Sequence, residues 1–410
     1  MKYIVLLGDG MADYPLPELQ GKTPLYVAHT PHMDRIAAEG TLGLIDTIPA
    51  GFTPGSDVAN LSVLGYDPTV YHTGRAPLEA ASMGVELASD DVVASRCNLV
   101  TLGSAGGETV MEDFTAGHIS SGEARRIVES LNEELGSPVI EFYPGVGYRH
   151  LMVYKGGPVS LETTPPHDIT GQPIADRMPK GGGAEEIKRL MERSRAILKD
   201  HPVNRERAAK GKKTADSIWL WGEGRAPAME PMTARYGIRG GIISAVDLLR
   251  GIGIYAGLEV LPVEGATGYI DTNYRGKADR ALAYLEDGDF VFLHVEAPDE
   301  MGHEGDIEGK IRAIEDFDRE IVGTILTGIG ALGDFRVMVL SDHPTPIELK
   351  THSSDPSPFA VLSSVDEENL GKGGLYHEAS AHDTGIVVSP GHLLMDYFMK
   401  DWRGFIEKKR

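Results

Sequence analysis

Three short, almost continuously apolar runs constrain the fold of this chain more than any other feature. They are YIVLL at residues 3–7, FVFLHV at 290–295 and FRVMVL at 335–340. A strand with one face in solvent alternates apolar and polar residues, whereas a strand covered on both faces is apolar at nearly every position. The runs therefore predict a mainly parallel sheet with helices on both faces, which is a doubly wound α/β fold.

The segments around these runs supply further elements of such a fold. Helices are predicted at 30–40, 307–326 and 390–402, and additional strands at 359–364 and 385–389. The first and last of these helices follow a Thr-Pro and a Ser-Pro pair. Thr and Ser are favoured N-cap residues and Pro suits the first helical turn, so both pairs indicate helix starts.

The middle of the chain has a different character. A chain of 410 residues exceeds the size at which one core usually stops growing, so we expect two domains. Residues 88–175 contain β-type runs around one helix at 120–136, which predicts a smaller inserted α+β domain. Residues 1–87 and 176–410 then form the main domain, and the Gly-rich stretch at 172–183 is the predicted hinge.

Composition excludes several classes of protein. The formal net charge is −22, with 61 acidic against 39 basic residues, which argues against binding to nucleic acid. Any anionic ligand must therefore be held by a local group of Arg, His or metal. The single cysteine, Cys97, excludes a disulfide framework. Because no stretch resembles a secretion signal or a membrane span, we expect a soluble, cytoplasmic protein.

Each of the three apolar runs is followed by an Asp, and His residues lie nearby. Ligands of open α/β sheets bind beyond the carboxyl ends of the strands, so these ends can meet although hundreds of residues separate them. Three Asp and three His at one edge suit two divalent cations. Singly, each residue also fits a turn, a cap or a surface position. The candidate ligands are Asp9, Asp299, His303, Asp342, His343 and His352.

A Gly/Pro-rich loop, AGFTPGSD, delivers Ser56 to the start of a predicted helix at 57–64. One interpretation makes Ser56 an N-cap. The other makes it a nucleophile, because a helix N-terminus favours a phosphoryl group and a neighbouring metal ion activates a hydroxyl. The candidate metal ligands favour the second interpretation.

These motifs together resemble a known family. The ordered set GDG, PGSD, PDEMGH, SDH and THSSDPSP is similar to that of the alkaline phosphatase superfamily. The segments YHTGRAPLEAASMG, TAGHIS and GGIISAVDLLRGIGIYAGL extend the resemblance over nearly the whole chain, to the archaeal-type cofactor-independent phosphoglycerate mutases. The bacterial-type enzymes carry Asn-Ser-Glu where this chain has Gly-Ser-Asp, which weakens the transfer of neighbouring contacts from that branch.

The resemblance implies interconversion of 3-phosphoglycerate and 2-phosphoglycerate through a phosphoserine at Ser56, without 2,3-bisphosphoglycerate. It implies two divalent ions, with manganese expected and magnesium, zinc or cobalt as alternatives. One ion has the ligands Asp9, Asp342, His343 and Ser56, and the other has Asp299, His303 and His352.

A mutase of this kind must retain glycerate between the two phosphoryl transfers, so we expect the inserted domain to act as a lid. The lid should supply cationic groups and a proton shuttle. Asp113 is the candidate acid or base, and the candidate substrate-binding residues are Arg75, His118, Arg149, His150, His167 and Asp168. Singly, each also fits a surface or turn position.

Two other functions remain open from the sequence. The first is a phosphatase or another phosphomutase of the same superfamily, with the same metal site and a different lid. The second is a non-catalytic metal-binding protein. In each case we expect a small phosphorylated ligand or metal rather than nucleic acid or membrane, and the sequence is compatible with a homo-oligomer.

Overall fold

The structure, a computed structural model, describes residues 1–371 and 373–409. The chain divides into two compact units. The first unit comprises Met1–His72 and Ala228–Arg410, and the second comprises Thr73–Pro227. The second unit is therefore one continuous segment, inserted between the two segments of the first. Among the described residues, no helix is both long and apolar enough to cross a membrane.

The first unit is built on an eight-stranded sheet with the order β11-β10-β12-β1-β13-β14-β2-β15. Strand β1 runs parallel to both β12 and β13, whereas β14 is antiparallel to β13 and β2. Every residue of β12 is buried, so the predicted α/β fold with a mainly parallel sheet is confirmed. The strands are β1 Lys2–Gly8, β2 Thr41–Ile45, β10 Gly240–Ile243, β11 Glu259–Val260, β12 Phe290–Val295, β13 Phe335–Leu340, β14 Ser357–Ser363 and β15 Val387–Val388.

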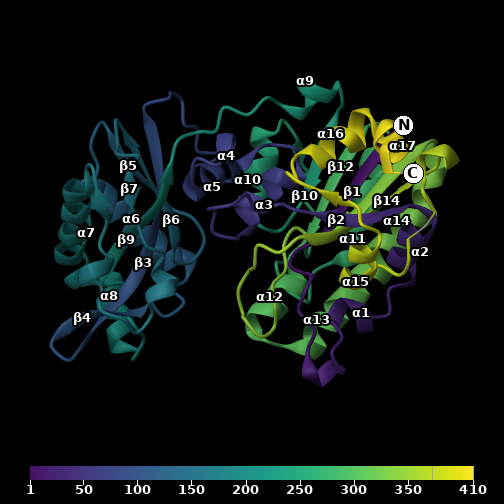
Figure 1. Ribbon diagram of the computed structural model, residues 1–410. Helices are drawn as coiled ribbons and strands as arrows, with labels where there is room; N and C mark the ends of the chain where they lie inside the picture. The colour runs from purple at the N-terminus through teal and green to yellow at the C-terminus, as the bar shows by residue number, and fades with distance from the viewer. Residues whose placement is uncertain (372, 410) are drawn as a thin grey trace. The chain divides into compact units, whose positions relative to one another are not determined.

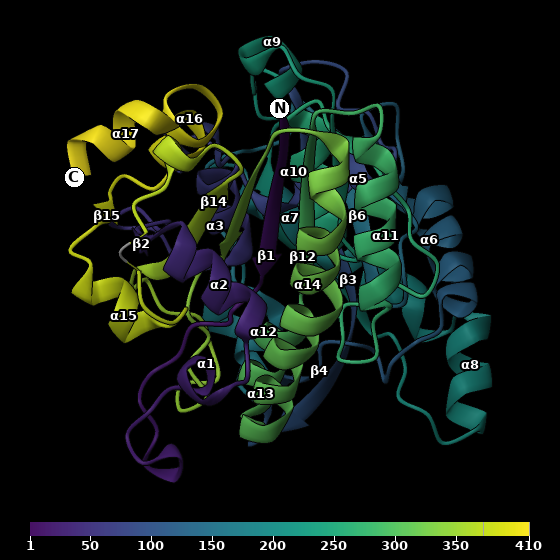
Figure 2. The same ribbon diagram turned by 90° about the vertical axis from the view of Figure 1, so that its right-hand side faces the viewer.

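Helices cover this sheet, and α2, α11, α13 and α14 lie together over one face (Figure 2). Their apolar side chains and those of the central strands form one buried cluster, with Ile4, Leu293 and Val339 from the sheet and Ile36 and Ile314 from the helices. The helices of the first unit are α1 Pro24–Val27, α2 Pro31–Glu39, α3 Ser56–Val63, α4 Pro68–Tyr71, α9 Met232–Tyr236, α10 Asp247–Tyr255, α11 Tyr274–Leu285, α12 Ala297–Glu304, α13 Ile307–Asp316, α14 Gly323–Gly328, α15 Glu378–Asp383, α16 Leu393–Lys400 and α17 Trp402–Lys409. Short 3-10 turns lie at Pro17–Leu19, Ile329–Leu332 and Asp366–Glu368, and a π-helical turn at Phe317–Val322.

Two details differ from the predicted helices. The last predicted helix, 390–402, is instead the pair α16 and α17, because Asp401 between them leaves the helical conformation. At the start of α2, the side chain of Thr30 makes no capping hydrogen bond. The carboxylate of Asp318, in the π-helical turn, accepts the N–H groups of His32 and Met33 instead. A side chain distant in sequence therefore caps this helix.

The second unit has its own sheet, with the order β4-β3-β6-β5 and with β9 also paired to β3 (Figure 1). Helices α6 and α7 contribute to its apolar core, and α6 begins with a capping box formed by Ser120 and Glu123. The strands are β3 Val92–Ala105, β4 Glu108–Asp113, β5 Ile140–Tyr143, β6 Arg149–Lys155, β7 Leu161–Glu162, β8 Lys180–Gly181 and β9 Ser217–Gly224. The helices are α5 Arg75–Ser82, α6 Ser121–Leu135, α7 Ala184–Lys199 and α8 Pro202–Ala209, with 3-10 turns at Pro166–Ile169 and Ala175–Arg177.

The inserted unit is larger than the predicted 88–175. Its last strand, β9, pairs antiparallel with β3, and α5 packs on both strands, so the unit extends from 73 to 227. The predicted hinge at 172–183 lies inside this unit, where β8 pairs with β7. The apolar run in β9 resembles a strand of the main sheet, and sequence pattern alone does not reveal which sheet a strand joins.

Candidate functional site

Parallel strands bring three aspartates to one edge of the first unit's sheet. Asp9 follows β1 and Asp342 follows β13, and the backbone N–H of Gly10 donates a hydrogen bond to Asp342 Oδ1 at 3.1 Å. Asp299 lies in the first turn of α12, which follows β12. All three side chains are almost fully buried. The sequence prediction that these residues lie together used only the direction of the strands, because parallel strands end at the same edge of a sheet.

Three of the candidate ligands lie close to the ring of a fourth, His343. Nε2 of His343 lies 3.5 Å from Asp9 Oδ1, 3.4 Å from Asp342 Oδ2 and 3.2 Å from the hydroxyl of Ser56. Ligand atoms about 2.0–2.2 Å from a common cation are separated by about this much. Asp9, Asp342 and His343 therefore match a cation site, with the Ser56 hydroxyl at its border.

A second group lies beside the first. Nε2 of His303 lies 3.1 Å from Asp299 Oδ2 and 3.0 Å from Nε2 of His352, which is 3.5 Å from Asp299 Oδ1. Ligand atoms of Asp299, His343 and His352 also lie within 4.8 Å of one another. His343 is thus adjacent to both groups, and the two groups form one continuous cluster.

The other ring nitrogen of each histidine faces an oxygen. Nδ1 of His303 lies 3.0 Å from the carbonyl of Lys350, and Nδ1 of His352 lies 3.4 Å from that of Pro54. Nδ1 of His343 lies 3.3 Å from the hydroxyl of Thr345. A carbonyl only accepts, so the rings of His303 and His352 carry their proton on Nδ1 and direct the Nε2 lone pair into the cluster. Two lone pairs 3.0 Å apart require a proton or a cation between them.

The charges in the cluster also fit a cation. Within the described residues, buried Asp9 Oδ1 has no hydrogen-bond partner. Burial, and then the nearby carboxylates of Asp342, Glu296 and Asp299, raise the pKa of Asp9 well above its ordinary value. Burial and the charges of Asp299 and Glu300 raise the pKa of Glu296 to about 8. A divalent ion relieves this repulsion, so the residues present fit bound cations.

The pKa of Asp299 is shifted in the opposite direction, below its ordinary value. Burial alone would raise its pKa, but hydrogen bonds with His303 and His352 hold the pKa of this carboxyl well below its usual range. Although burial disfavours the charged ring, Asp299 raises the pKa of His303 to about 9. At neutral pH His303 is therefore protonated and supplies the proton that bridges the second group, and a cation bound there would displace this proton.

The structure also shows the environment of Ser56. The N-cap of α3 is Gly55, and Ser56 is the first helical residue. Its hydroxyl faces His343. The next residue, Asp57, lies 3.0 Å from Nε2 of His72. The geometry is that of an available hydroxyl at a helix start, beside the Asp/His cluster.

Several residues that support the cluster were not predicted. Asn60 Nδ2 lies 2.9 Å from the carbonyl of Ser56 and 2.8 Å from Asp342 Oδ2, so it ties the two together. Nε2 of His294 lies 2.8 Å from Asp9 Oδ2, and its Nδ1 lies 3.1 Å from the hydroxyl of Ser244. Two sequence features could have identified these residues. Asn60 lies one helical turn after Ser56, and His294 is a polar residue within the apolar run of β12.

The candidate residues of the second unit are only partly brought together. His167 contacts the rings of Phe114 and Trp221, Phe114 contacts Tyr148, and the Arg149 guanidinium lies 5.8 Å from the Tyr148 ring. Arg149 and His167 thus border one aromatic cluster. Asp168 lies 3.5 Å from His167 and is exposed.

Two arginines lie beside this aromatic cluster. An added Cβ on Gly222 would lie within 4 Å of both Arg75 and Arg96, so their side chains flank this glycine. The Arg96 guanidinium lies 4.2 Å from the Trp221 ring. Burial lowers the pKa of Arg96 to about 10, and Arg75 and Arg149 add to this shift against the effect of Glu79. Arg96, which was not predicted, is therefore part of a concentration of positive charge.

The remaining candidates have separate environments. Asp113 accepts hydrogen bonds from the N–H and hydroxyl of Thr115 and lies 3.2 Å from Lys213. Burial opposes the effect of these contacts, which nevertheless lower its pKa. His118 is exposed at the end of a tight turn. His150 is buried, and its Nδ1 accepts the N–H of Gly145 at 3.0 Å.

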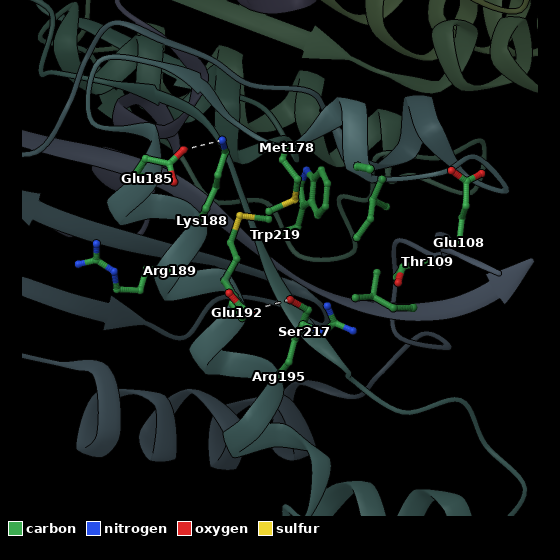
Figure 3. A pocket seen from close by; sticks show the side chains of 14 residues that line it. Glu108, Thr109, Met178, Glu185, Lys188, Arg189, Glu192, Arg195, Ser217 and Trp219 are labelled. Carbon is green, nitrogen blue, oxygen red and sulfur yellow. Dashed lines mark hydrogen bonds and ion pairs between the residues drawn. The ribbon is translucent and has the colours of Figure 1, made fainter.

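A cavity of about 560 Å³ lies elsewhere in the second unit, beside α7 (Figure 3). Trp219, Met178 and Met191 line its apolar part, and Lys188 and Arg195 stand at its border. Its lining, taken from the described residues, contains none of the candidate site residues. This cavity is therefore lined by other residues than those of the aromatic cluster.

Comparison with known proteins gives consistent results. The family described as 2,3-bisphosphoglycerate-independent phosphoglycerate mutase matches residues 37–204. A probable enzyme of this name from Geobacter sulfurreducens is 55% identical over 97% of this chain and 100% of its own length. One from Methanosarcina barkeri is 53% identical over 95% of this chain and 99% of its own.

Solved structures show the same similarity. A protein from Pyrococcus horikoshii has a TM-score of 0.80 and 30% identity, over 98% of this chain and 97% of its own. The cofactor-independent phosphoglycerate mutase from Thermoplasma acidophilum has a TM-score of 0.65 and 26% identity, over 98% of this chain and 99% of its own.

Proposed function

This chain belongs to the family of 2,3-bisphosphoglycerate-independent phosphoglycerate mutases, which are isomerases, and on that premise we propose a mechanism for it. The chain interconverts 3-phosphoglycerate and 2-phosphoglycerate through a phosphoserine at Ser56. The family name itself implies that 2,3-bisphosphoglycerate is not needed. The observation that carries the proposal is the convergence of Asp9, Asp342 and His343, together with the Ser56 hydroxyl 3.2 Å from Nε2 of His343.

The cluster has the residues to hold two divalent cations. Asp9, Asp342, His343 and Ser56 would hold one, and Asp299, His303 and His352 would hold the other. When bound, such ions neutralise charge on the phosphoryl oxygens and favour ionisation of a coordinated hydroxyl. Mixed carboxylate and imidazole ligands accept manganese, magnesium, zinc or cobalt, and manganese is the ion we expect.

Ser56 carries the phosphoryl group between the two positions of the substrate. Its Oγ attacks phosphorus, the bond from phosphorus to the 3-oxygen of glycerate breaks, and the hydroxyl proton passes to that oxygen. The 2-hydroxyl of glycerate then attacks the phosphoserine and returns the proton to Ser56. The free N–H groups at the start of α3 favour the negative phosphoryl group.

The second unit is the proposed lid, which retains glycerate between the two transfers. The predicted contacts are Arg75, His118, Arg149, His150, His167 and Asp168, and the position of Arg96 beside Arg75 supports adding it. Asp113 is the proposed acid or base. Hydrogen bonds from Thr115 and the nearby Lys213 lower its pKa against the effect of burial, so its carboxyl is ionised at neutral pH.

The decisive assay uses chelator-treated protein with 3-phosphoglycerate, with and without Mn²⁺, and without added bisphosphoglycerate. We expect Mn²⁺-dependent formation of 2-phosphoglycerate with little free phosphate. Release of free phosphate at the rate of substrate consumption would instead identify a phosphatase of the same superfamily. Absence of both reactions in Mn²⁺-loaded protein would support the non-catalytic alternative.

A further inference from the structure

A buried lysine lies behind the Asp/His cluster. Lys310, in α13, has no exposed surface, and its ammonium group donates three hydrogen bonds. The acceptors are Asp13 Oδ2 at 2.7 Å, the carbonyl of Thr345 at 2.9 Å and the carbonyl of Ala12 at 3.2 Å. A buried ammonium group is costly unless all its protons are accepted, and here all three are.

The three acceptors belong to the loops that carry the candidate ligands. Ala12 and Asp13 follow Asp9 after β1, and Thr345 follows His343 after β13. The two loops are also joined directly, because the N–H of Thr345 donates to the carbonyl of Ala12 at 3.2 Å. Lys310 thus binds both loops from α13.

Thr345 links Lys310 to the candidate ligands. Its hydroxyl donates to Asp299 Oδ1 and lies 3.3 Å from Nδ1 of His343. Its carbonyl, held by Lys310, packs against Gly302, where an added Cβ would lie 2.6 Å away. Thr345 therefore contacts both groups of candidate cation ligands through its side chain, and it contacts Lys310 through its carbonyl.

We propose that Lys310 is a positioning residue that holds the ligand loops after β1 and β13 at the separation that two cations require. This proposal rests on the cation sites of the proposed function. Lys310 acts through the backbone of Ala12 and Thr345, and its hydrogen bonds go to none of the ligand atoms. Loss of the ammonium group should leave every ligand side chain present but change the distances between them. Residues that orient metal ligands typically alter metal affinity 10- to 100-fold.

The test must separate positioning from stability. Lys310→Met removes the ammonium group but leaves Asp13 buried without its partner, which destabilises a protein strongly. The double variant Lys310→Met/Asp13→Asn removes both charges, and such replacements are often close to neutral. Asn at 13 keeps an acceptor for the N–H of Ile347, which the carboxylate accepts at 3.2 Å.

Arg336 offers a matched control in the same unit. It is buried near the start of β13 and pairs with Glu368 at 2.6 Å. It lies six residues before Asp342 along an extended strand, which is a distance of roughly 20 Å. Arg336→Met therefore also breaks a buried ion pair, but at the opposite end of the strand from the cluster.

The measurement is Mn²⁺ affinity of the metal-free proteins, by electron paramagnetic resonance of the free ion, with circular dichroism and thermal unfolding for folding. We expect the folded double variant to bind Mn²⁺ about 10-fold or more weakly, and Arg336→Met to unfold at lower temperature with unchanged affinity. Excess Mn²⁺ should restore activity to the double variant. Unchanged Mn²⁺ affinity in the folded double variant would overturn the positioning role, whereas failure of the wild type to bind Mn²⁺ would overturn the proposed function itself.

Discussion

Nε2 of His343 lies 3.2 Å from the hydroxyl oxygen of Ser56, although 287 residues separate them in the chain. Strand β13 delivers the histidine and helix α3 delivers the serine, so their proximity depends on the whole first unit being folded. The arrangement leaves the serine hydroxyl beside ligand atoms of buried Asp and His residues. Five measurements follow from it and from the environment of the other candidate residues.

The first prediction concerns metal stoichiometry. Wild-type protein should bind two Mn²⁺ ions per chain, and Asp299→Asn should bind one, because the variant loses the charge that holds the second ion. Equilibrium dialysis with elemental analysis measures this. Asp306→Asn is the control, since Asp306 caps the nearby helix α13 and Asn also serves as an N-cap. Equal stoichiometry in wild type and Asp299→Asn would contradict the assignment.

The second prediction concerns Asn60. Asn60→Leu removes the hydrogen bonds to the Ser56 carbonyl and to Asp342 Oδ2, so the proposed nucleophile and one proposed ligand lose their common support. We expect kcat to fall roughly 10-fold or more with a smaller change in KM. Ser62→Ala, in the same helix, removes a buried hydrogen bond to Thr47 and should cost about 1 kcal/mol of stability with nearly unchanged kcat. Equal kcat values for the two variants would show that Asn60 does not position Ser56 and Asp342 for the reaction.

The third prediction is a pH dependence of stability that arises from His150. Burial lowers the pKa of this ring to about 4 from an ordinary value of 6.5. The unfolded chain therefore binds the proton more readily, and the stabilising contribution of the neutral ring, present above pH 6.5, is lost as pH falls toward 4. The full effect is about 3 kcal/mol. His150→Asn keeps an acceptor for Gly145 but does not titrate.

Urea unfolding of wild type and His150→Asn at pH 7 and pH 5 tests this directly. The wild type should lose more stability than the variant on acidification, because all other groups contribute equally to both. Parallel losses in the two proteins would show that His150 is not buried in its neutral form.

The fourth prediction compares two glycines that lie close in sequence. Ala116, Gly117 and His118 all have positive φ, and the buried Arg207 holds this turn through the carbonyls of Ala116 and Gly117. An added Cβ on Gly117 would lie 2.8 Å from Lys213 Cβ, whereas one on Gly122 meets nothing within 4 Å. Gly117→Ala should destabilise by at least about 1 kcal/mol.

Gly122→Ala, in the first turn of α6, should instead stabilise by about 0.5–1 kcal/mol, because Ala has the higher helix propensity. Chemical denaturation gives both values. A destabilising change of the same size in both variants would mean that the turn at 116–118 is not strained.

The sequence predicted the candidate ligands because their positions follow from strand direction. Asp9, Asp299 and Asp342 each follow an apolar run, and parallel strands end at one edge, so no tertiary information was needed. The motifs around them also identified the family, which the 55% identity to a relative confirms. His294 and Asn60 were missed because they lie inside regular elements rather than at strand ends.

Pairing partners could not be predicted in the same way. Strand β9 is as apolar as the central strands, and only its pairing with β3 assigns it to the second unit. The carbonyl of Lys350 that orients His303, and the Asp318 carboxylate that caps α2, are supplied by segments distant in sequence. Such contacts depend on packing, which local patterns do not encode.

The identity of the group that carries the phosphoryl tests the central claim most directly. Protein loaded with Mn²⁺ and mixed with 3-phosphoglycerate should be quenched in acid within milliseconds, digested and analysed by mass spectrometry. The account predicts one phosphoryl group on Ser56, absent in Ser56→Ala and retained in Thr53→Ala, which alters an exposed hydroxyl of the same loop. A phosphoryl group on another residue, or undiminished isomerisation by Ser56→Ala, would contradict it.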